Sequence, residues 1–139
     1  MCLMKLKYQF NDGGRFLAGY SGGVGDCVVR ALSIATGSSY SNMYEFVNRT
    51  ARCFESHSKV KSSNAYGIYS DSVKGIMKIL GLKWIAKKNN GMLAIPSKGT
   101  YIVSLIGHVC AVVDGTIHDT HNTIDPINLT LAQGYWKVK

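Results

Sequence analysis

The stretch GDCVVRALSIATG, residues 25–37, decides the fold because it reads as a helix that is apolar on nearly every side. Asp26 is a good N-cap, the helical run starts at Cys27, and Gly37 stands where a helix commonly ends. A helix that is apolar all round is a buried helix. We therefore expect residues 27–36 to form a helix in the core.

Two amphipathic helices follow, each with one apolar stripe at helical spacing. The first begins at Ser41 or Asn42 and should pack on the core helix. Its stripe consists of Met43, Phe46, Val47, Thr50 and Phe54. The second is capped by Ser70 or Asp71 and ends at Gly81, a typical residue just beyond a helix C-terminus. Its buried face consists of Val73, Ile76, Met77 and Leu80.

From Leu82 onward the pattern changes to short runs rich in β-branched and aromatic residues, which are typical of strands. We expect strands at residues 82–86, 92–95, 101–106, 108–113, 116–119 and 135–138, and an edge strand at 3–10. The glycine-rich segment 11–25 and the serine-rich segment 56–69 read as loops. Helices first and a mainly antiparallel sheet second predict an α+β fold, since alternating β and α units would predict a parallel sheet.

The composition is that of a globular protein. A chain of 139 residues with 46% hydrophobic and 17% charged residues can fold as one domain, residues 1–139. No apolar stretch suits a secretory signal or a membrane span. The four cysteines are widely spaced, which favours reduced thiols in the cytoplasm over a disulfide framework. The net charge of +8 suits an acidic partner, but scattered lysines fit a solvated basic surface better.

Cys27 is the candidate nucleophile because of its position at a helix N-terminus. A thiol attacks as its thiolate, and the unpaired N–H groups of a first helical turn favour that negative charge. The same N–H groups could hold the oxyanion that forms on attack, and the glycine-rich approach would admit a substrate backbone. A free cysteine is more often a small buried hydrophobe, so only the position makes Cys27 a functional candidate.

The partner of the thiol should come from the hairpin at residues 108–119. Its Asp-Gly pair at 114–115 favours a two-residue type I′ turn, which sets Ala111 opposite His118 and Cys110 opposite Asp119. Side chains alternate along each strand, so His108, Cys110 and Asp119 share one face of the sheet.

This register makes His108 the candidate base and Asp119 its orienting acid, because the two are diagonal neighbours on one face. His118 points to the other face, and Asp114 is used by the turn. The second choices for the orienting role are His121 and Asn122.

The segments GDCVVRAL (25–32), GHVCAVVDG (107–115) and IHD (117–119) resemble small papain-like cysteine peptidases, including uncharacterised members from phages and bacteria. The resemblance extends from about Gly22 to Asn122. It implies a papain-like fold and a triad of Cys27, His108 and Asp119 that hydrolyses an amide or isopeptide bond of a protein or peptide through an acyl-thioester, without a cofactor. For a phage-encoded member it also implies the host cytoplasm.

Ser21 and Asp26 are the candidates for oxyanion or substrate binding beside the thiol. Papain-like enzymes usually place a glutamine where this chain has Ser21. The carboxylate of Asp26 would oppose a negative charge on the thiol if it faced the site. Either Ser21 and the backbone N–H of Cys27 suffice for the oxyanion, or activity is weak or lost.

Three other functions compete with hydrolysis. A metal site could use the His, Cys and Asp residues of 108–121, but the chain lacks a Cys-x-x-Cys pair. Nucleic acid could bind Lys83, Lys87, Lys88 and Lys98 with Trp84 and Tyr101 as stacking residues, although Trp84 fits better in the core. The third is a weakly active or inactive papain-like protein that binds a host protein or nucleic acid through its basic surface.

Overall fold

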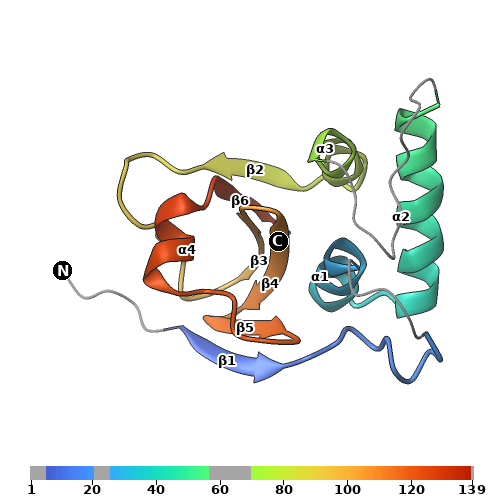
Figure 1. Ribbon diagram of the computed structural model, residues 1–139, viewed down its shortest axis with the longest axis horizontal. Helices are drawn as coiled ribbons and strands as arrows, with labels where there is room; N and C mark the ends of the chain where they lie inside the picture. The colour runs from blue at the N-terminus through green and yellow to red at the C-terminus, as the bar shows by residue number, and fades with distance from the viewer. Residues whose placement is uncertain (1–5, 21–25, 57–69, 139) are drawn as a thin grey trace.

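The computed structural model describes residues 6–20, 26–56 and 70–138, and its fold is α+β. The longer helices lie on one side of the molecule, and a curved sheet with one short helix lies on the other (Figure 1). The helices are α1 (Cys27–Thr36), α2 (Tyr40–Phe54), α3 (Ser70–Ile79) and α4 (Pro126–Leu131). The strands are β1 (Lys7–Phe10), β2 (Lys83–Ala86), β3 (Thr100–Leu105), β4 (His108–Val113), β5 (Thr116–Asp119) and β6 (Gly134–Lys137).

The sheet is mixed, with the strand order β1-β5-β4-β3-β6-β2. β1 pairs with β5 in parallel, and the pairs β5–β4, β4–β3, β3–β6 and β6–β2 are antiparallel. The expected order of elements is confirmed, with helices α1 to α3 ahead of a mainly antiparallel sheet.

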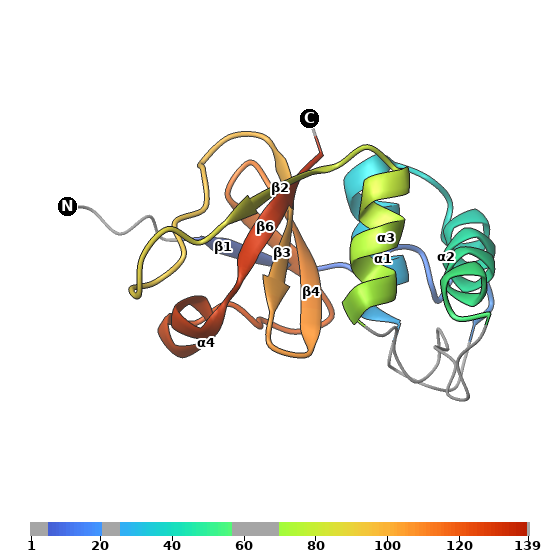
Figure 2. The ribbon, with the colours of Figure 1, turned by 90° about the horizontal axis from the view of Figure 1, so that it is seen from above.

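α1 lies between the sheet and α2, as Figures 1 and 2 show. Its residues from Val28 to Ser33 are all buried, which confirms the expected core helix. Apolar side chains of the three helices meet one face of the sheet in a single cluster that includes Val29, Leu32, Val47, Ile76, Ile102 and Ala111. A second cluster covers the opposite face, with Val103, Val112 and Ile117 from the strands and Leu93 and Ile95 from a connecting segment.

The β4–β5 hairpin has the register expected from its turn. Ala111 lies opposite His118, and Asp114 and Gly115 form the turn with φ angles of 47° and 77°. Positive φ at both central residues is what a type I′ turn requires. The turn therefore positions His108 and Asp119 together at the other end of the hairpin.

Two expectations about local structure were wrong, and one helix was not predicted. Residues 92–95 are not a strand: Leu93 and Ile95 are apolar because they pack in the second cluster, and Leu93 N bonds to Leu129 O of α4. α4 itself was not expected, although Asp125 caps it with Pro126 in the first turn. Trp84 is 39% exposed rather than buried in the core.

The ends of the expected helices also differ slightly. α2 begins at Tyr40 with Ser39 as its cap, and Phe54 at its end is half-exposed instead of belonging to the buried stripe.

The expected loop at 56–69 falls almost wholly outside the described residues, as do Cys2 and Ser21. Cys27, Cys53 and Cys110 are free thiols. Within the described ranges no helix has the length and apolar character needed to cross a membrane.

Candidate active site

Cys27 is the first residue of α1, and its side chain is half-buried. The first main-chain hydrogen bond of the helix joins Arg30 N to Asp26 O at 3.0 Å. The N–H groups before Arg30 therefore have no acceptor within the helix. Such groups stabilise a negative charge on a thiol or on the oxygen of a tetrahedral intermediate.

His108, the first residue of β4, lies between Cys27 and Asp119, the last residue of β5. Its Nε2 is 2.6 Å from Asp119 Oδ2. The imidazole also hydrogen-bonds the thiol of Cys27, which accepts a second hydrogen bond from the backbone N–H of Val109. The three residues expected to form a triad are thus in contact in the expected order.

His118 does not contact the thiol, but the reason differs from the one expected. Ala111 faces the helices, and His118 lies directly opposite it, so His118 is on the face that α1 covers. Its Nδ1 lies 3.3 Å from Nδ2 of Asn11. His108 belongs to the other face by alternation, yet it contacts Cys27, because it is the first residue of β4 and so lies at the end of the strand.

Asp119 is held by several hydrogen bonds and is only 3% exposed. Its Oδ1 accepts a hydrogen bond from the backbone N–H of Thr120 at 2.8 Å and lies 3.5 Å from Nη2 of Arg30. Its Oδ2 accepts from the hydroxyl of Thr123 at 3.1 Å, in addition to its contact with His108. A carboxylate fixed in this way can orient the imidazole and stabilise its protonated form.

The pKa of the Cys27 thiol is lowered. Burial by itself raises this pKa, but the hydrogen bonds from His108 and the backbone of Val109 outweigh it. The positive charges of His108 and Arg30 lower the pKa further. This combination favours the thiolate, the reactive form of a cysteine.

The pKa of His108 is raised to about 9. Burial acts to lower this pKa, while the hydrogen bonds to Asp119 and Cys27 and the charges of both partners raise it. Burial likewise acts to raise the pKa of Asp119, but contact with His108, the backbone of Thr120 and Arg30 lowers it. The site therefore favours a thiolate–imidazolium pair backed by a carboxylate.

Arg30 connects the site to the core of the helical layer, and the sequence did not single it out. It is 5% exposed and forms ion pairs with Asp26, one helical turn back, and with Asp119. Asp26 also accepts a hydrogen bond from the hydroxyl of Tyr40 and lies 3.4 Å from Nε of Arg15. The sequence could have pointed to Arg30, because a charged residue inside an apolar helix must find a buried partner.

The expectation that Asp26 contributes to oxyanion or substrate binding is not met. Its side chain is 2% exposed and is occupied by Arg30, Tyr40 and Arg15, so it faces the core rather than a substrate. Asp26 stands at the N-cap of α1, but its side chain makes no capping hydrogen bond. A carboxylate surrounded by two guanidinium groups is more stable in this pairing than as a cap. Ser21, the other candidate, lies outside the described residues.

The remaining acid and orienting candidates are occupied elsewhere. Asp114 is exposed, and its Oδ1 accepts a hydrogen bond from Gly99 N at 2.8 Å, at the turn end of the hairpin. Asn122 Oδ1 accepts from a backbone N–H two residues further on. The ring of His121 lies 6.0 Å from that of His108, so His121 borders the site without orienting the base.

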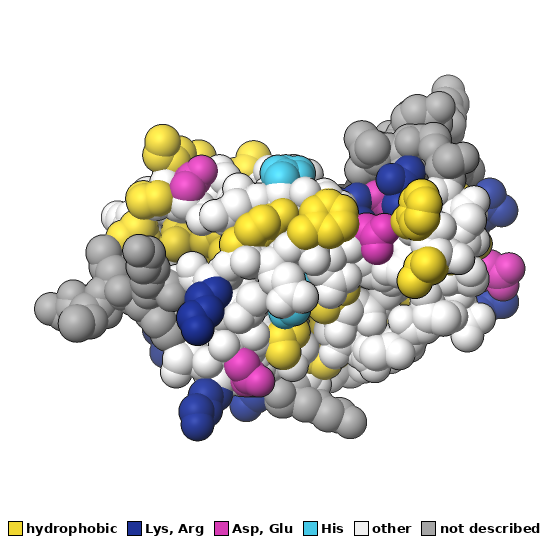
Figure 3. Space-filling view, turned by 90° about the horizontal axis from the view of Figure 1, so that it is seen from below, with side chains coloured by type: hydrophobic (Ala, Val, Ile, Leu, Met, Phe, Trp, Pro, Cys, Tyr) yellow, Lys and Arg dark blue, Asp and Glu magenta, His cyan; other side chains and the backbone are white. Residues whose placement is uncertain are grey.

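A pocket of about 820 Å³ lies next to His108. Its apolar lining residues are Phe10, Phe16, Leu17 and Tyr20, and its polar ones are Asp12, Arg15, Arg30, Thr120 and the histidines 108 and 121. In the space-filling view from the side of β1, hydrophobic side chains form a run across the face with histidine beside them (Figure 3). His108 therefore opens onto a cavity whose walls combine exposed apolar side chains with polar and charged ones.

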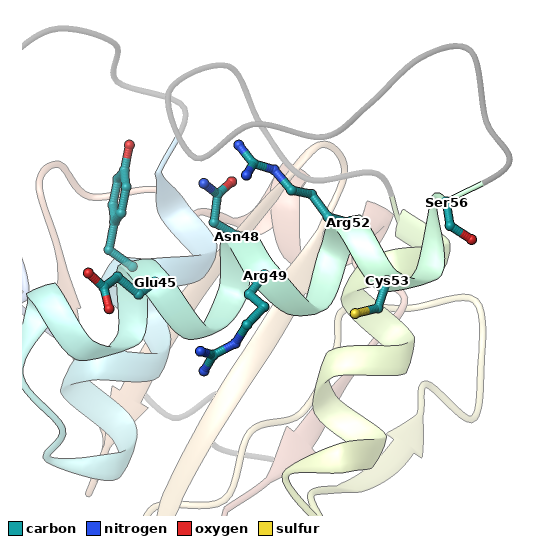
Figure 4. Close-up of a pocket in the computed structure, with 7 residues that line it drawn as sticks. Glu45, Asn48, Arg49, Arg52, Cys53 and Ser56 are labelled. Carbon is teal, nitrogen blue, oxygen red and sulfur yellow. The ribbon is translucent and has the colours of Figure 1, made fainter.

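A second pocket, of about 630 Å³, lies along α2 and contains a different thiol, Cys53. Figure 4 shows its side chains pointing in different directions, with Arg49 and Arg52 on opposite sides of the helix. Among the described residues that line it there is no histidine, so they place no imidazole base beside Cys53. Cys110 is buried in the sheet, where burial and the charge of Asp119 raise its pKa to about 12, so it is unreactive.

The structure also bears on the other two chemistries that the sequence left open. Among residues 6–20, 26–56 and 70–138 no three His, Cys, Asp or Glu side chains are grouped so that they could hold a metal ion. Tyr101, one proposed stacking residue, is 6% exposed and cannot meet a base. Trp84 packs on Trp136 with ring centroids 4.6 Å apart.

No protein-family model, curated protein or solved structure matches this chain.

Proposed function

We propose that this chain is a thiol-dependent hydrolase of the papain-like type, cleaving an amide or isopeptide bond of a protein or peptide. The observation that carries the proposal is the position of His108, hydrogen-bonded to the thiol of Cys27 and, at 2.6 Å, to buried Asp119. A nucleophile, a base and a group that orients the base are then within hydrogen-bond reach of one another.

In the acylation step the Cys27 thiolate attacks the carbonyl carbon of the scissile bond. The oxygen gains negative charge and accepts hydrogen bonds from N–H groups at the start of α1, including that of Cys27. Protonated His108 gives its proton to the departing nitrogen as the carbon–nitrogen bond breaks. The products of this step are an acyl-thioester on Cys27, a free amine and a neutral imidazole.

Deacylation uses the same groups in reverse. Neutral His108 accepts a proton from water, whose oxygen attacks the thioester carbonyl. The carbon–sulfur bond breaks, the acid product leaves and the thiolate–imidazolium pair is restored. Asp119 stays ionised throughout, because its role is to hold the ring and stabilise the imidazolium.

Selective alkylation tests the proposal. Brief treatment of the folded protein with iodoacetamide at pH 6, followed by mass mapping, should label Cys27 before Cys53, which is exposed on α2 and serves as the reference thiol. His108→Ala should slow labelling of Cys27 and leave labelling of Cys53 unchanged. If Cys27 in the parent reacts no faster than Cys53, the hydrolase proposal fails, and a basic binding protein with an inactive site becomes the better interpretation.

A further inference from the structure

We propose that the pocket beside His108 binds a large apolar side chain on the leaving-group side of the scissile bond, that is, on the residue just after it. This inference rests on the proposed function, since it assigns the substrate class of the same site. The ligand is a peptide segment whose new N-terminal residue, after cleavage, is aromatic or large and aliphatic.

The first argument is the exposure of the apolar walls. Phe16 is 82% exposed, Leu17 92% and Phe10 64%, and all three line the pocket. Single exposed apolar residues are ordinary on a protein surface, but three around one cavity form a patch that a ligand would cover. The run of hydrophobic side chains in Figure 3 lies on this face.

The second argument is that the charged groups of the pocket already bind the protein itself. Asp12 accepts hydrogen bonds from the backbone N–H groups of Gly14, at 2.9 Å, and Phe16, at 3.0 Å. Arg15 and Arg30 both pair with Asp26. A charged ligand would have to compete with these contacts, whereas an apolar side chain would bury the walls without breaking any of them.

The third argument is that the segment 10–20, which carries the apolar walls of the pocket, packs closely against α1. Gly13 has a φ of 71°, and a Cβ at this position would lie 3.1 Å from the backbone of Arg30. The ring of Tyr20 packs edge-on against Tyr40, with centroids 4.9 Å apart. The walls are therefore held in place before a ligand arrives, which reduces the entropy lost on binding.

The fourth argument assigns the pocket to one side of the scissile bond. His108 and His121 line the pocket and Cys27 does not. The leaving nitrogen must lie near His108, because that ring supplies its proton. A pocket on the imidazole side of the thiol therefore receives the side chain attached to the leaving nitrogen.

Aminolysis of the acyl-enzyme isolates this pocket from the rest of the substrate. p-Nitrophenyl acetate would acetylate Cys27 and release p-nitrophenolate. An amine that occupies the leaving-group site then attacks the thioester, gives its proton to His108 and releases the Cys27 thiolate, which yields an N-acetyl amide. Phenylalaninamide and glycinamide compete in one sample, and their acetylated products are measured by mass spectrometry. The same competition on a free acetyl thioester gives the intrinsic reactivity ratio of the two amines.

We expect the parent to favour phenylalaninamide over the intrinsic ratio by about 10-fold or more, since a few buried carbons are worth that much in an apolar pocket. Phe16→Ser combined with Leu17→Ser should bring the preference, which is read from the two acetylated products in one sample, close to the intrinsic ratio. Ile127→Ser is the matched control, because Ile127 is 71% exposed on α4 and does not line the pocket. It should keep the parental preference.

Three results would overturn the inference, and they are distinguishable. If p-nitrophenyl acetate fails to acetylate Cys27, the proposed function and the inference both fail. If acetylation occurs but the parent shows only the intrinsic ratio, or the double variant keeps the parental preference, the hydrolase proposal stands and the pocket assignment fails. If sedimentation shows a parental dimer that the double variant dissociates, the patch belongs to a second copy of the chain instead.

Discussion

The two ends of the β4–β5 hairpin each carry an aspartate, and the two residues have opposite surroundings. Asp114, at the turn, is exposed and binds the nearby backbone N–H of Gly99. Asp119, at the open end, is 3% exposed and contacts His108, Thr123 and Arg30. The sequence separates these residues by only five positions.

The difference shows that the fold, rather than the residue type, decides which carboxylate can take part in chemistry. An exposed carboxylate in a turn is solvated, and its one local bond shapes the backbone. A buried carboxylate must be stabilised by charged partners, and it shifts the pKa of each partner in return. At the open end of the hairpin the shifted group is His108, whose pKa rises to about 9.

The largest expected effect comes from removing the base. His108→Ala should lower turnover of p-nitrophenyl acetate by about 10²–10⁴-fold, because the thiol loses both its charge partner and its proton acceptor. His118→Ala should stay close to the parent, because His118 contacts Asn11 and not the thiol. Circular dichroism should first establish that both variants are folded. If both variants are folded and His118→Ala turns over more slowly than His108→Ala, then His108 is not the base.

Exchanging each aspartate for asparagine tests the comparison directly. Asp119→Asn should lower turnover by about 10²–10⁴-fold, because an amide can hold the ring but can favour the wrong tautomer and carries no charge. Asp114→Asn should be nearly neutral, since an asparagine oxygen can still accept from Gly99 and Asn-Gly supports the same turn. Steady-state rates for the two folded variants decide the matter. Equal losses in both would mean that the hairpin acts only as a scaffold.

The same contrast between buried and exposed carboxylates applies to stability, with Asp26 and Asp125 as the pair. Asp26→Asn removes the charge facing Arg30 and Arg15 and should cost about 3–5 kcal/mol in the free energy of unfolding. Asp125→Asn should change that free energy by less than about 0.5 kcal/mol, because asparagine is an equally good helix cap for α4. Urea unfolding measures both. Similar small losses would show that Arg30 does not depend on Asp26.

Much of the site could be predicted from the sequence because strong local signals determine it. The Asp-Gly turn sets the hairpin register, and the apolar run after Asp26 sets the start of α1. These two signals bring His108 and Asp119 together and place Cys27 at a helix N-terminus. Each depends on a few neighbouring residues, which is why the interpretation was reliable there.

The rest depends on contacts that are distant in sequence. The sequence preferred His108 to His118 because the two side chains point to opposite faces of the sheet. That reason was wrong, because His118 is the one on the face that α1 covers. Only the complete fold shows that the start of β4 lies beside the start of α1, where His108 contacts Cys27. The ion pair between Arg30 and Asp119 joins α1 to β5 across 89 positions. A charged residue in an apolar helix indicates that Arg30 needs a buried partner, but no local pattern identifies Asp119 as that partner. The segment 92–95 looked like a strand because burial and strand pairing both select apolar residues.

The smallest expected effect is a change in the pKa of His108, and it probes the open end of the hairpin without any substrate. In the parent, an NMR titration should give a pKa of about 9, above the value of 6.5 for a free histidine. A pKa that is raised by folding contributes stability in full below about pH 6.5, and this stability is lost as the pH rises through about 9. Asp119→Asn and Cys27→Ser should each lower the pKa, because each removes a hydrogen bond and a charge that favour the imidazolium. Asp114→Asn should leave the pKa of His108 unchanged, since Asp114 lies at the far end of the hairpin.

The difference in unfolding free energy between the parent and Asp119→Asn should accordingly shrink as the pH rises from 6.5 to 9. A parental pKa near 6.5, or one that Asp119→Asn does not move, would mean that the buried aspartate does not act on the base and that the two ends of the hairpin are electrostatically alike.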